Sequence, residues 1–76
     1  MLTIKCSRCK SKLYKYYKVG KGKVIKCHKS RIKKQFGIYR DNGNYKCKCG
    51  NIIGSDEDSY IKMNNKAFIY TGTKEG

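Results

Sequence analysis

Hydrophobic and polar residues alternate over short stretches of this chain, and glycine or asparagine interrupts the alternation at three places. These turn signals lie at residues 20–22 (Gly-Lys-Gly), 41–44 (Asp-Asn-Gly-Asn) and 64–65 (Asn-Asn), each between β-branched or aromatic residues. Short alternating stretches on both sides of such a turn are typical of β-hairpins. The pattern predicts an all-β fold of about six short antiparallel strands.

The three turns predict three hairpins. Their arms are, in chain order, residues 12–19 with 23–28, residues 38–39 with 45–46, and residues 60–63 with 67–71. The segment 31–36 fits either a helix or a strand, because Ile32 and Phe36 are four residues apart and also occupy alternate positions. We favour a strand there.

The size of the chain limits how stable a hydrophobic core can make it. The 76 residues predict a single domain, residues 1–76, and only 38% of them are hydrophobic. A core in a domain of this size supplies about 3–5 kcal/mol, so most such domains need a metal or disulfides as well. A further stabilising element is therefore expected.

Two closely spaced cysteine pairs offer that element. Cys6-Ser7-Arg8-Cys9 and Cys47-Lys48-Cys49-Gly50 are separated by residues 10–46. Two such pairs supply the four thiolates of a tetrahedral zinc site, and a glycine after the last cysteine permits a tight turn around the metal. We predict one Zn²⁺ bound by Cys6, Cys9, Cys47 and Cys49. Iron in the same four-thiolate geometry is the chemical alternative.

Cys27 and His28 lie between the two pairs and are also competent zinc ligands. Adjacent residues of a strand point to opposite faces, so at most one of them would reach a metal. We expect Cys27 to pack as a small hydrophobic residue and His28 to be exposed, because four other cysteines already complete the tetrahedron.

The charge of the chain is strongly asymmetric. Its formal net charge is +14, and residues 1–40 hold 14 of the 19 Lys and Arg residues but none of the five acids. Such a basic half predicts an anionic partner.

Lysine and tyrosine alternate in this basic half, where Tyr14 and Tyr16 would share a strand face with Lys12 and Lys18. Lysines that follow phosphates, with aromatic rings on which bases stack, are typical of single-strand binding surfaces. The expected contacts are Lys12, Tyr14, Lys15, Tyr16, Lys18, Lys21, Lys23, Lys26, Arg31, Lys33 and Lys34. RNA or single-stranded DNA is the predicted ligand. The 16 lysines against three arginines favour backbone contact over base reading.

Other interpretations of the basic half remain. The lysines and tyrosines can form an ordinary solvated sheet face, or they can dock the protein on an acidic partner in the transcription or translation machinery. A small redox or iron protein is a third alternative.

Catalysis and membrane insertion are not expected. The chain has one histidine, no phosphate-binding loop and no recognisable pair of carboxylates, and a four-thiolate zinc has no open position for substrate. Residues 1–6 show no apolar run long enough for a signal peptide, and no stretch elsewhere approaches the length of a membrane span. We therefore expect a cytoplasmic protein, in which clustered cysteines bind metal rather than form disulfides.

The two cysteine pairs, the segment 47–54 (Cys-Lys-Cys-Gly-Asn-Ile-Ile-Gly) and the segment 17–23 resemble small uncharacterised zinc-ribbon proteins of archaeal type. This resemblance implies a zinc-stapled antiparallel sheet that binds nucleic acid or docks on ribosomal or transcription machinery. The second pair has one residue fewer than the usual Cys-x-x-Cys. The β-tent of yippee-like domains, which also joins two cysteine pairs across a sheet, is a related arrangement.

Overall fold

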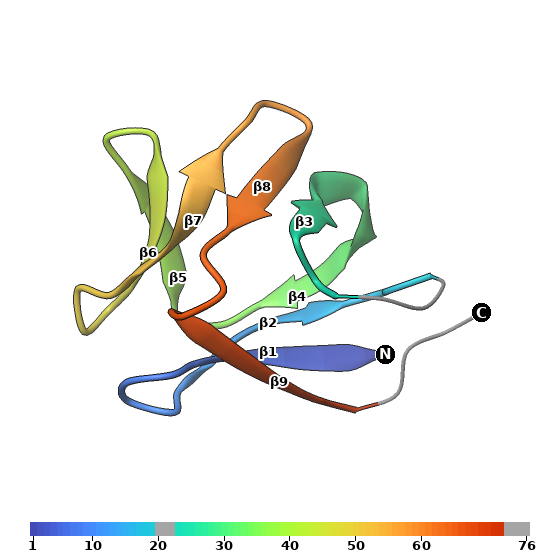
Figure 1. Ribbon diagram of the computed structural model, residues 1–76, viewed down its shortest axis with the longest axis horizontal. Helices are drawn as coiled ribbons and strands as arrows, with labels where there is room; N and C mark the ends of the chain where they lie inside the picture. Colours follow the sequence, from blue (N-terminus) through green and yellow to red (C-terminus); the bar gives the residue numbers. More distant parts are fainter. Residues whose placement is uncertain (20–22, 73–76) are drawn as a thin grey trace.

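The computed structural model describes residues 1–19 and 23–72. These residues form nine strands and one turn of 3₁₀ helix, with no α-helix among them (Figure 1). The elements are β1 (Leu2–Cys6), β2 (Lys12–Tyr16), β3 (Lys26–His28), η1 (Lys29–Arg31), β4 (Ile32–Gln35), β5 (Ile38–Asp41), β6 (Asn44–Cys47), β7 (Ile52–Asp56), β8 (Tyr60–Met63) and β9 (Phe68–Gly72). The predicted all-β class is confirmed, but the strand count of about six was too low.

The strands form two antiparallel sheets. The four-stranded sheet has the order β4-β2-β1-β9, and the five-stranded sheet has the order β3-β8-β7-β6-β5. In Figure 1 the four-stranded sheet lies in the lower half and most of the five-stranded sheet above it. The chain crosses between the sheets four times: after β2, after β3, after β4 and after β8.

The hydrophobic core lies between the two sheets and receives side chains from both. The four-stranded sheet contributes Leu2, Ile4, Leu13, Tyr14, Tyr16 and Phe68, and the five-stranded sheet contributes Cys27, Ile53, Ile61 and Met63. Tyr14 is fully buried, and its hydroxyl donates to Cys27 Sγ at 3.0 Å. Tyr16 accepts from the backbone N–H of His28 at 2.9 Å. Both tyrosines therefore cross the core and bond to β3.

A β-bulge explains why the consecutive residues Leu13 and Tyr14 are both buried. Ile4 pairs with Tyr14 and Lys5 pairs with Lys12, so Leu13 is the extra residue of β2. An extra residue disturbs the strict alternation of faces along its strand. Leu13 consequently turns inward, although a regular strand would expose it.

The predicted hairpins have mixed outcomes. The second is confirmed, because β5 pairs with β6 across residues 41–44. The first is wrong: β2 pairs with β1 and β4, while β3 pairs with β8. The third is wrong as well, because β8 pairs with β7 and β3, and β9 with β1. The strand favoured within residues 31–36 is confirmed as β4. The turn predicted at 20–22 lies outside the described residues.

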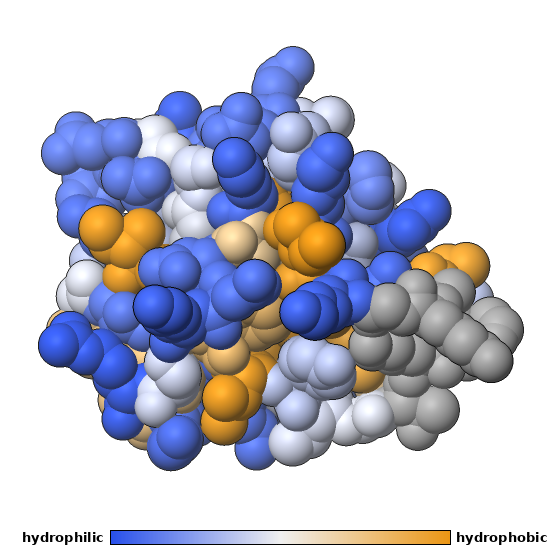
Figure 2. Space-filling model, viewed as in Figure 1, coloured by the Kyte–Doolittle hydropathy of each residue, from blue (hydrophilic) through white to orange (hydrophobic). Residues whose placement is uncertain are grey.

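Hydrophilic residues cover most of the molecular face in Figure 2, and hydrophobic residues form separate patches between them. Within residues 1–19 and 23–72, no helix has the length and apolar character that crossing a membrane requires.

Candidate metal centre and basic surface

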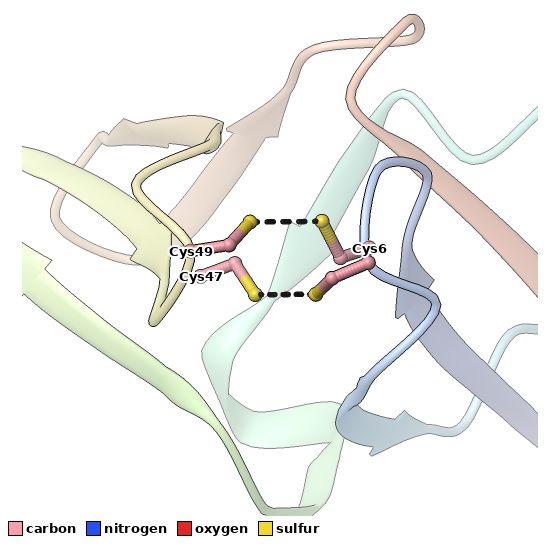
Figure 3. Close-up of side chains that lie close together, drawn as sticks. Cys6, Cys47 and Cys49 are labelled. Carbon is pink, nitrogen blue, oxygen red and sulfur yellow. Dashed lines mark hydrogen bonds between the residues drawn. The ribbon is translucent and has the colours of Figure 1, made fainter.

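The four cysteines of the two predicted pairs lie together, and they come from different sheets. Cys6 ends β1 and Cys9 lies in the β1–β2 loop, whereas Cys47 ends β6 and Cys49 lies in the β6–β7 loop. The two loops face each other across the sulfur atoms (Figure 3). In each pair the first cysteine is buried and the second is exposed. The cluster therefore joins one hairpin of the four-stranded sheet to one hairpin of the five-stranded sheet.

Backbone hydrogen bonds shape each loop around its cysteines. In the first knuckle, residues 6–11, the Cys6 N–H donates to Ser11 O, and the Lys10 N–H donates to Cys6 O, each at 3.0 Å. In the second knuckle, residues 47–51, the Cys47 N–H donates to Asn51 O at 2.9 Å. The N–H of the residue after Cys49, Gly50, donates to Cys47 O at 2.8 Å.

The second knuckle is thus the first one shortened by a single residue. In both, the first cysteine pairs with the last residue of the loop, and the residue after the second cysteine has a positive φ, 64° at Lys10 and 94° at Gly50. The Cys-x-Cys spacing therefore forms the same kind of thiol-presenting turn as Cys-x-x-Cys.

The sulfur positions fit one tetrahedral metal ion. All four Sγ atoms lie within 4.8 Å of one another, with 3.6 Å between Cys6 and Cys49 and 3.4 Å between Cys9 and Cys47. A Zn–S bond of about 2.3 Å in a tetrahedron separates the sulfurs by about 3.8 Å. Disulfide formation requires about 2.05 Å, and the structure has all five cysteines free. These four residues can hold a metal ion.

Asn51 is a part of this site that the sequence analysis did not single out. Its Nδ2 donates to Cys6 Sγ at 3.4 Å and to Ala67 O at 2.9 Å. Ala67 O also accepts from the Ser7 N–H at 3.0 Å. Asn51 therefore links the second knuckle to a cysteine of the first and to the segment before β9. The only sequence signal was its position directly after Cys-Lys-Cys-Gly.

Burial and hydrogen bonding differ among the thiols, and their pKa values differ as a result. Burial acts to raise the pKa of Cys6, but hydrogen bonds from the Cys9 N–H, Asn51 and the Arg8 N–H lower it overall. Hydrogen bonds with the Ser11 side chain and backbone lower the pKa of Cys9 to about 6. Burial raises the pKa of Cys47 to about 12. A divalent ion at the centre of the cluster would stabilise all the thiolates together.

The fifth cysteine and the histidine lie elsewhere. Cys27 is fully buried in the core on β3, and burial raises the pKa of its thiol to about 11. His28 is exposed, with its ring 6.1 Å from that of Tyr60. Neither residue belongs to the sulfur cluster.

The residues predicted to bind nucleic acid do not form one surface. Lys12, Lys15, Lys33 and Lys34 lie on β2 and β4, Lys26 lies on β3 in the other sheet, Arg31 is half-buried in η1, and Lys18 and Lys23 lie in loops. Lys21 lies outside the described residues. The predicted residues therefore lie on both sheets. Only the four-stranded sheet holds several of the predicted lysines.

Tyr14 and Tyr16 cannot serve as stacking surfaces, and this part of the prediction is wrong. They are 0% and 1% exposed because they cross the core. Among residues 1–19 and 23–72, two exposed aromatic residues have a lysine Nζ within 6.0 Å of the ring centre: Tyr17, which is 38% exposed, and Phe36, which is 42% exposed. Neither residue was in the predicted contact set, and Phe36 was considered only as a strand residue.

The register of the four-stranded sheet defines its outer face. Paired residues of antiparallel strands point to the same side, and Leu2, Ile4 and their partners Tyr16 and Tyr14 point into the core. The alternate positions must point outward. They form two rows across the sheet, Lys34–Lys15–Thr3–Thr71 and Lys12–Lys5–Ile69, which we call the outer sheet face.

The described acids lie in the other sheet and its loops. Asp56 on β7 bonds to Lys29 at 2.5 Å and to Arg40 at 2.6 Å, and Asp41 bonds to Lys46 at 3.1 Å. Hydrogen bonding to Lys29 lowers the pKa of Asp56. Between described residues, no ion pair involves a lysine of the outer sheet face.

Comparisons of the chain with protein-family models, with curated proteins and with solved structures gave no match. The function must therefore be inferred from the cysteine cluster and the surface themselves.

Proposed function

We propose that this protein is a non-catalytic zinc-binding module that binds nucleic acid through its lysine-rich surface. The proposal that the protein binds zinc rests on one observation, the cluster of four sulfur atoms within 4.8 Å of one another. Four thiolates in closed tetrahedral geometry are typical of structural zinc, and they leave no coordination position for a substrate. The ion would hold the β1–β2 and β6–β7 loops together.

We propose zinc rather than iron as the metal, and a simple measurement can check this choice. Both metals accept four thiolates, but iron in such a site absorbs visible light, whereas zinc is colourless. We expect purified protein to be colourless and to contain one zinc per chain. Cys47→Ser should abolish zinc binding, whereas Cys27→Ala should keep one equivalent, because Cys27 lies outside the cluster. Full zinc content in Cys47→Ser would overturn the four-cysteine assignment.

The proposal that the protein binds nucleic acid rests on the charge distribution. Every acid follows residue 40, while 14 basic residues precede residue 41. One zinc and four thiolates change the formal charge from +14 to about +12, so the bound metal does not remove the attraction to a polyanion. Lysines supply point charges for phosphates with little discrimination between bases, so we propose binding without marked sequence preference.

The test is fluorescence anisotropy of labelled RNA and DNA, single-stranded and duplex, titrated with zinc-loaded protein over a salt series. Binding through Z phosphate contacts should weaken with the logarithm of salt at a slope of about −0.7Z on single strands. Zinc-free protein is the control, because it keeps the positive charge while the cluster that joins the two sheets is lost. Binding that is absent in about 50 mM salt, or equal in zinc-free protein, would contradict the proposal and favour docking on an acidic protein.

A further inference from the structure

The outer sheet face gathers four lysines on one open side of the four-stranded sheet. Lys34 and Lys15 are direct partners across β4 and β2, and Lys12 and Lys5 are partners across β2 and β1. Adjacent strands lie about 4.8 Å apart, and residues two apart in a strand about 7 Å. The four ammonium groups can therefore follow neighbouring phosphates of one strand.

The remainder of this face suits a polyanion as well. The other members are Thr3, Thr71 and Ile69, which contribute two hydroxyls and one apolar side chain but no carboxylate. The acids described in the structure are the last residue of β5, the last residue of β7 and two residues of the turn after β7, all of them outside the four-stranded sheet. A phosphate backbone on the outer sheet face meets no described carboxylate there.

Phe36 adds an aromatic ring beside these lysines. The Nζ atoms of Lys12 and Lys34 lie 5.9 and 5.4 Å from its ring centre. The ring is 42% exposed and is fixed at the end of β4, where the Phe36 N–H donates to Leu13 O at 2.8 Å. A base can stack on this ring while its phosphates meet the two lysines. Paired bases of a duplex are already stacked within the helix and cannot do so.

We propose that single-stranded nucleic acid binds across the outer sheet face, with phosphates on Lys5, Lys12, Lys15 and Lys34 and an unpaired base on Phe36. This site rests on the proposed function and specifies where, and in which form, the nucleic acid binds. Of the eleven residues in the sequence prediction, this contact set keeps Lys12, Lys15 and Lys34. It adds Lys5 and Phe36, and it leaves out the two buried tyrosines and the six other basic residues.

Two triple variants with the same loss of charge test the site. Lys12, Lys15 and Lys34 are changed to Gln in the first variant, and the exposed lysines Lys48, Lys62 and Lys66, which lie outside the four-stranded sheet, are changed to Gln in the second. On labelled oligouridylate and oligothymidylate, the first variant should reduce the steepness of the log–log salt slope by about 2, which corresponds to three lost contacts. The second should keep the wild-type slope. Zinc content and circular dichroism verify that both variants fold.

Phe36→Leu tests the stacking step separately. Leucine keeps an apolar side chain but lacks the aromatic face, so single-strand affinity should fall roughly tenfold, while duplex affinity should stay within about twofold. Tyr39→Leu is the matched control, since Tyr39 is 45% exposed on β5 of the other sheet.

The outcomes separate this site from the proposed function. If the wild type binds single strands but both triple variants lose the same slope, the outer sheet face is wrong while nucleic-acid binding stands. If duplexes bind as tightly as single strands and Phe36→Leu changes nothing, the single-strand assignment is wrong. If the wild type binds no nucleic acid, the proposed function itself fails.

Discussion

The residue that follows the second cysteine of each knuckle turns the backbone into the left-handed region. Gly50 has a φ of 94° and Lys10 a φ of 64°. This conformation costs a residue with a side chain about 1–2 kcal/mol and costs glycine little. The second knuckle, which is one residue shorter, therefore has the residue best suited to its turn, whereas the first knuckle carries a strained lysine.

Gly50→Ala should lower the free energy of unfolding of the zinc-loaded protein by about 1 kcal/mol, and Lys10→Gly should raise it by a similar amount. A Cβ at Gly50 would meet no atom within 4 Å, so the effect isolates backbone conformation from crowding. Urea unfolding at fixed zinc concentration measures both changes. Gly37→Ala is the control, because Gly37 has no positive φ and its added Cβ would lie 3.5 Å from Lys12 O. An equal loss in Gly37→Ala would contradict this account.

Side-chain chemistry in the sequence was sufficient to predict which cysteines cluster but not the role of the tyrosines. Cysteine spacing constrains which thiols can share an ion, and the four predicted residues are the ones that cluster. Alternation shows that Tyr14 and Tyr16 share a face, but not whether that face is inward. Tyrosine suits either environment when its hydroxyl finds a partner, and here Cys27 Sγ and the His28 N–H supply those partners.

At the level of the strands, local signals predicted turns better than pairing partners. The β5–β6 hairpin was predicted correctly because its turn is encoded within four residues: Asn42 and Gly43 have φ values of 50° and 75°, as a tight hairpin turn requires. Two arms of the wrong hairpins have partners that are far along the chain: β3 pairs with β8, and β9 pairs with β1. No local turn residue specifies such a partner, because the core between the sheets selects it. Likewise, no glycine or proline in the sequence of β2 indicates that a bulge forms at Leu13.

Asp56 connects three of these elements. It lies at the end of β7 and bonds both to Lys29 of η1 and to Arg40 of β5. Hydrogen bonding to Lys29 lowers its pKa below the model-compound value of 3.8. A carboxyl whose pKa is lowered by folding stabilises the folded state above pH 3.8, and this contribution is lost as the pH falls through the lower, folded-state pKa.

Asp56→Asn should therefore lower the urea midpoint at pH 7 and have a smaller effect near pH 3, because below pH 3.8 the unfolded chain binds the proton and the contribution of the carboxylate is reduced. The measurement is urea unfolding of wild type and variant at several pH values, with zinc content checked at each. Asp58→Asn is the matched control, because Asp58 lies in the turn after β7 and has no ion pair with a described residue. A difference between wild type and Asp56→Asn that stays constant with pH would show that the ion pairs do not contribute.

At the level of the whole molecule, two sheets share one small core and one cysteine cluster. The core contains Cys6 and Cys47 themselves, so the cysteine cluster and the hydrophobic core are continuous. Without a cation, the buried Cys47 thiol resists ionisation, since its pKa is raised to about 12. The metal and the core are therefore expected to stabilise each other rather than act separately.

Zinc removal should consequently unfold the protein. A structural zinc site contributes about 10–16 kcal/mol of apparent binding free energy, whereas the core of so small a domain supplies about 3–5 kcal/mol. The experiment treats the reduced protein with a strong chelator at neutral pH, verifies zinc loss by elemental analysis, and records circular dichroism in the far ultraviolet and in the near-ultraviolet tyrosine region. The near-ultraviolet signal of buried Tyr14 and Tyr16 should vanish and return when zinc is restored, in the wild type and in Cys27→Ala alike. Unchanged spectra in verified zinc-free protein would mean that the core alone holds the two sheets together, and that the four sulfurs lie close because of the fold rather than because a metal binds them.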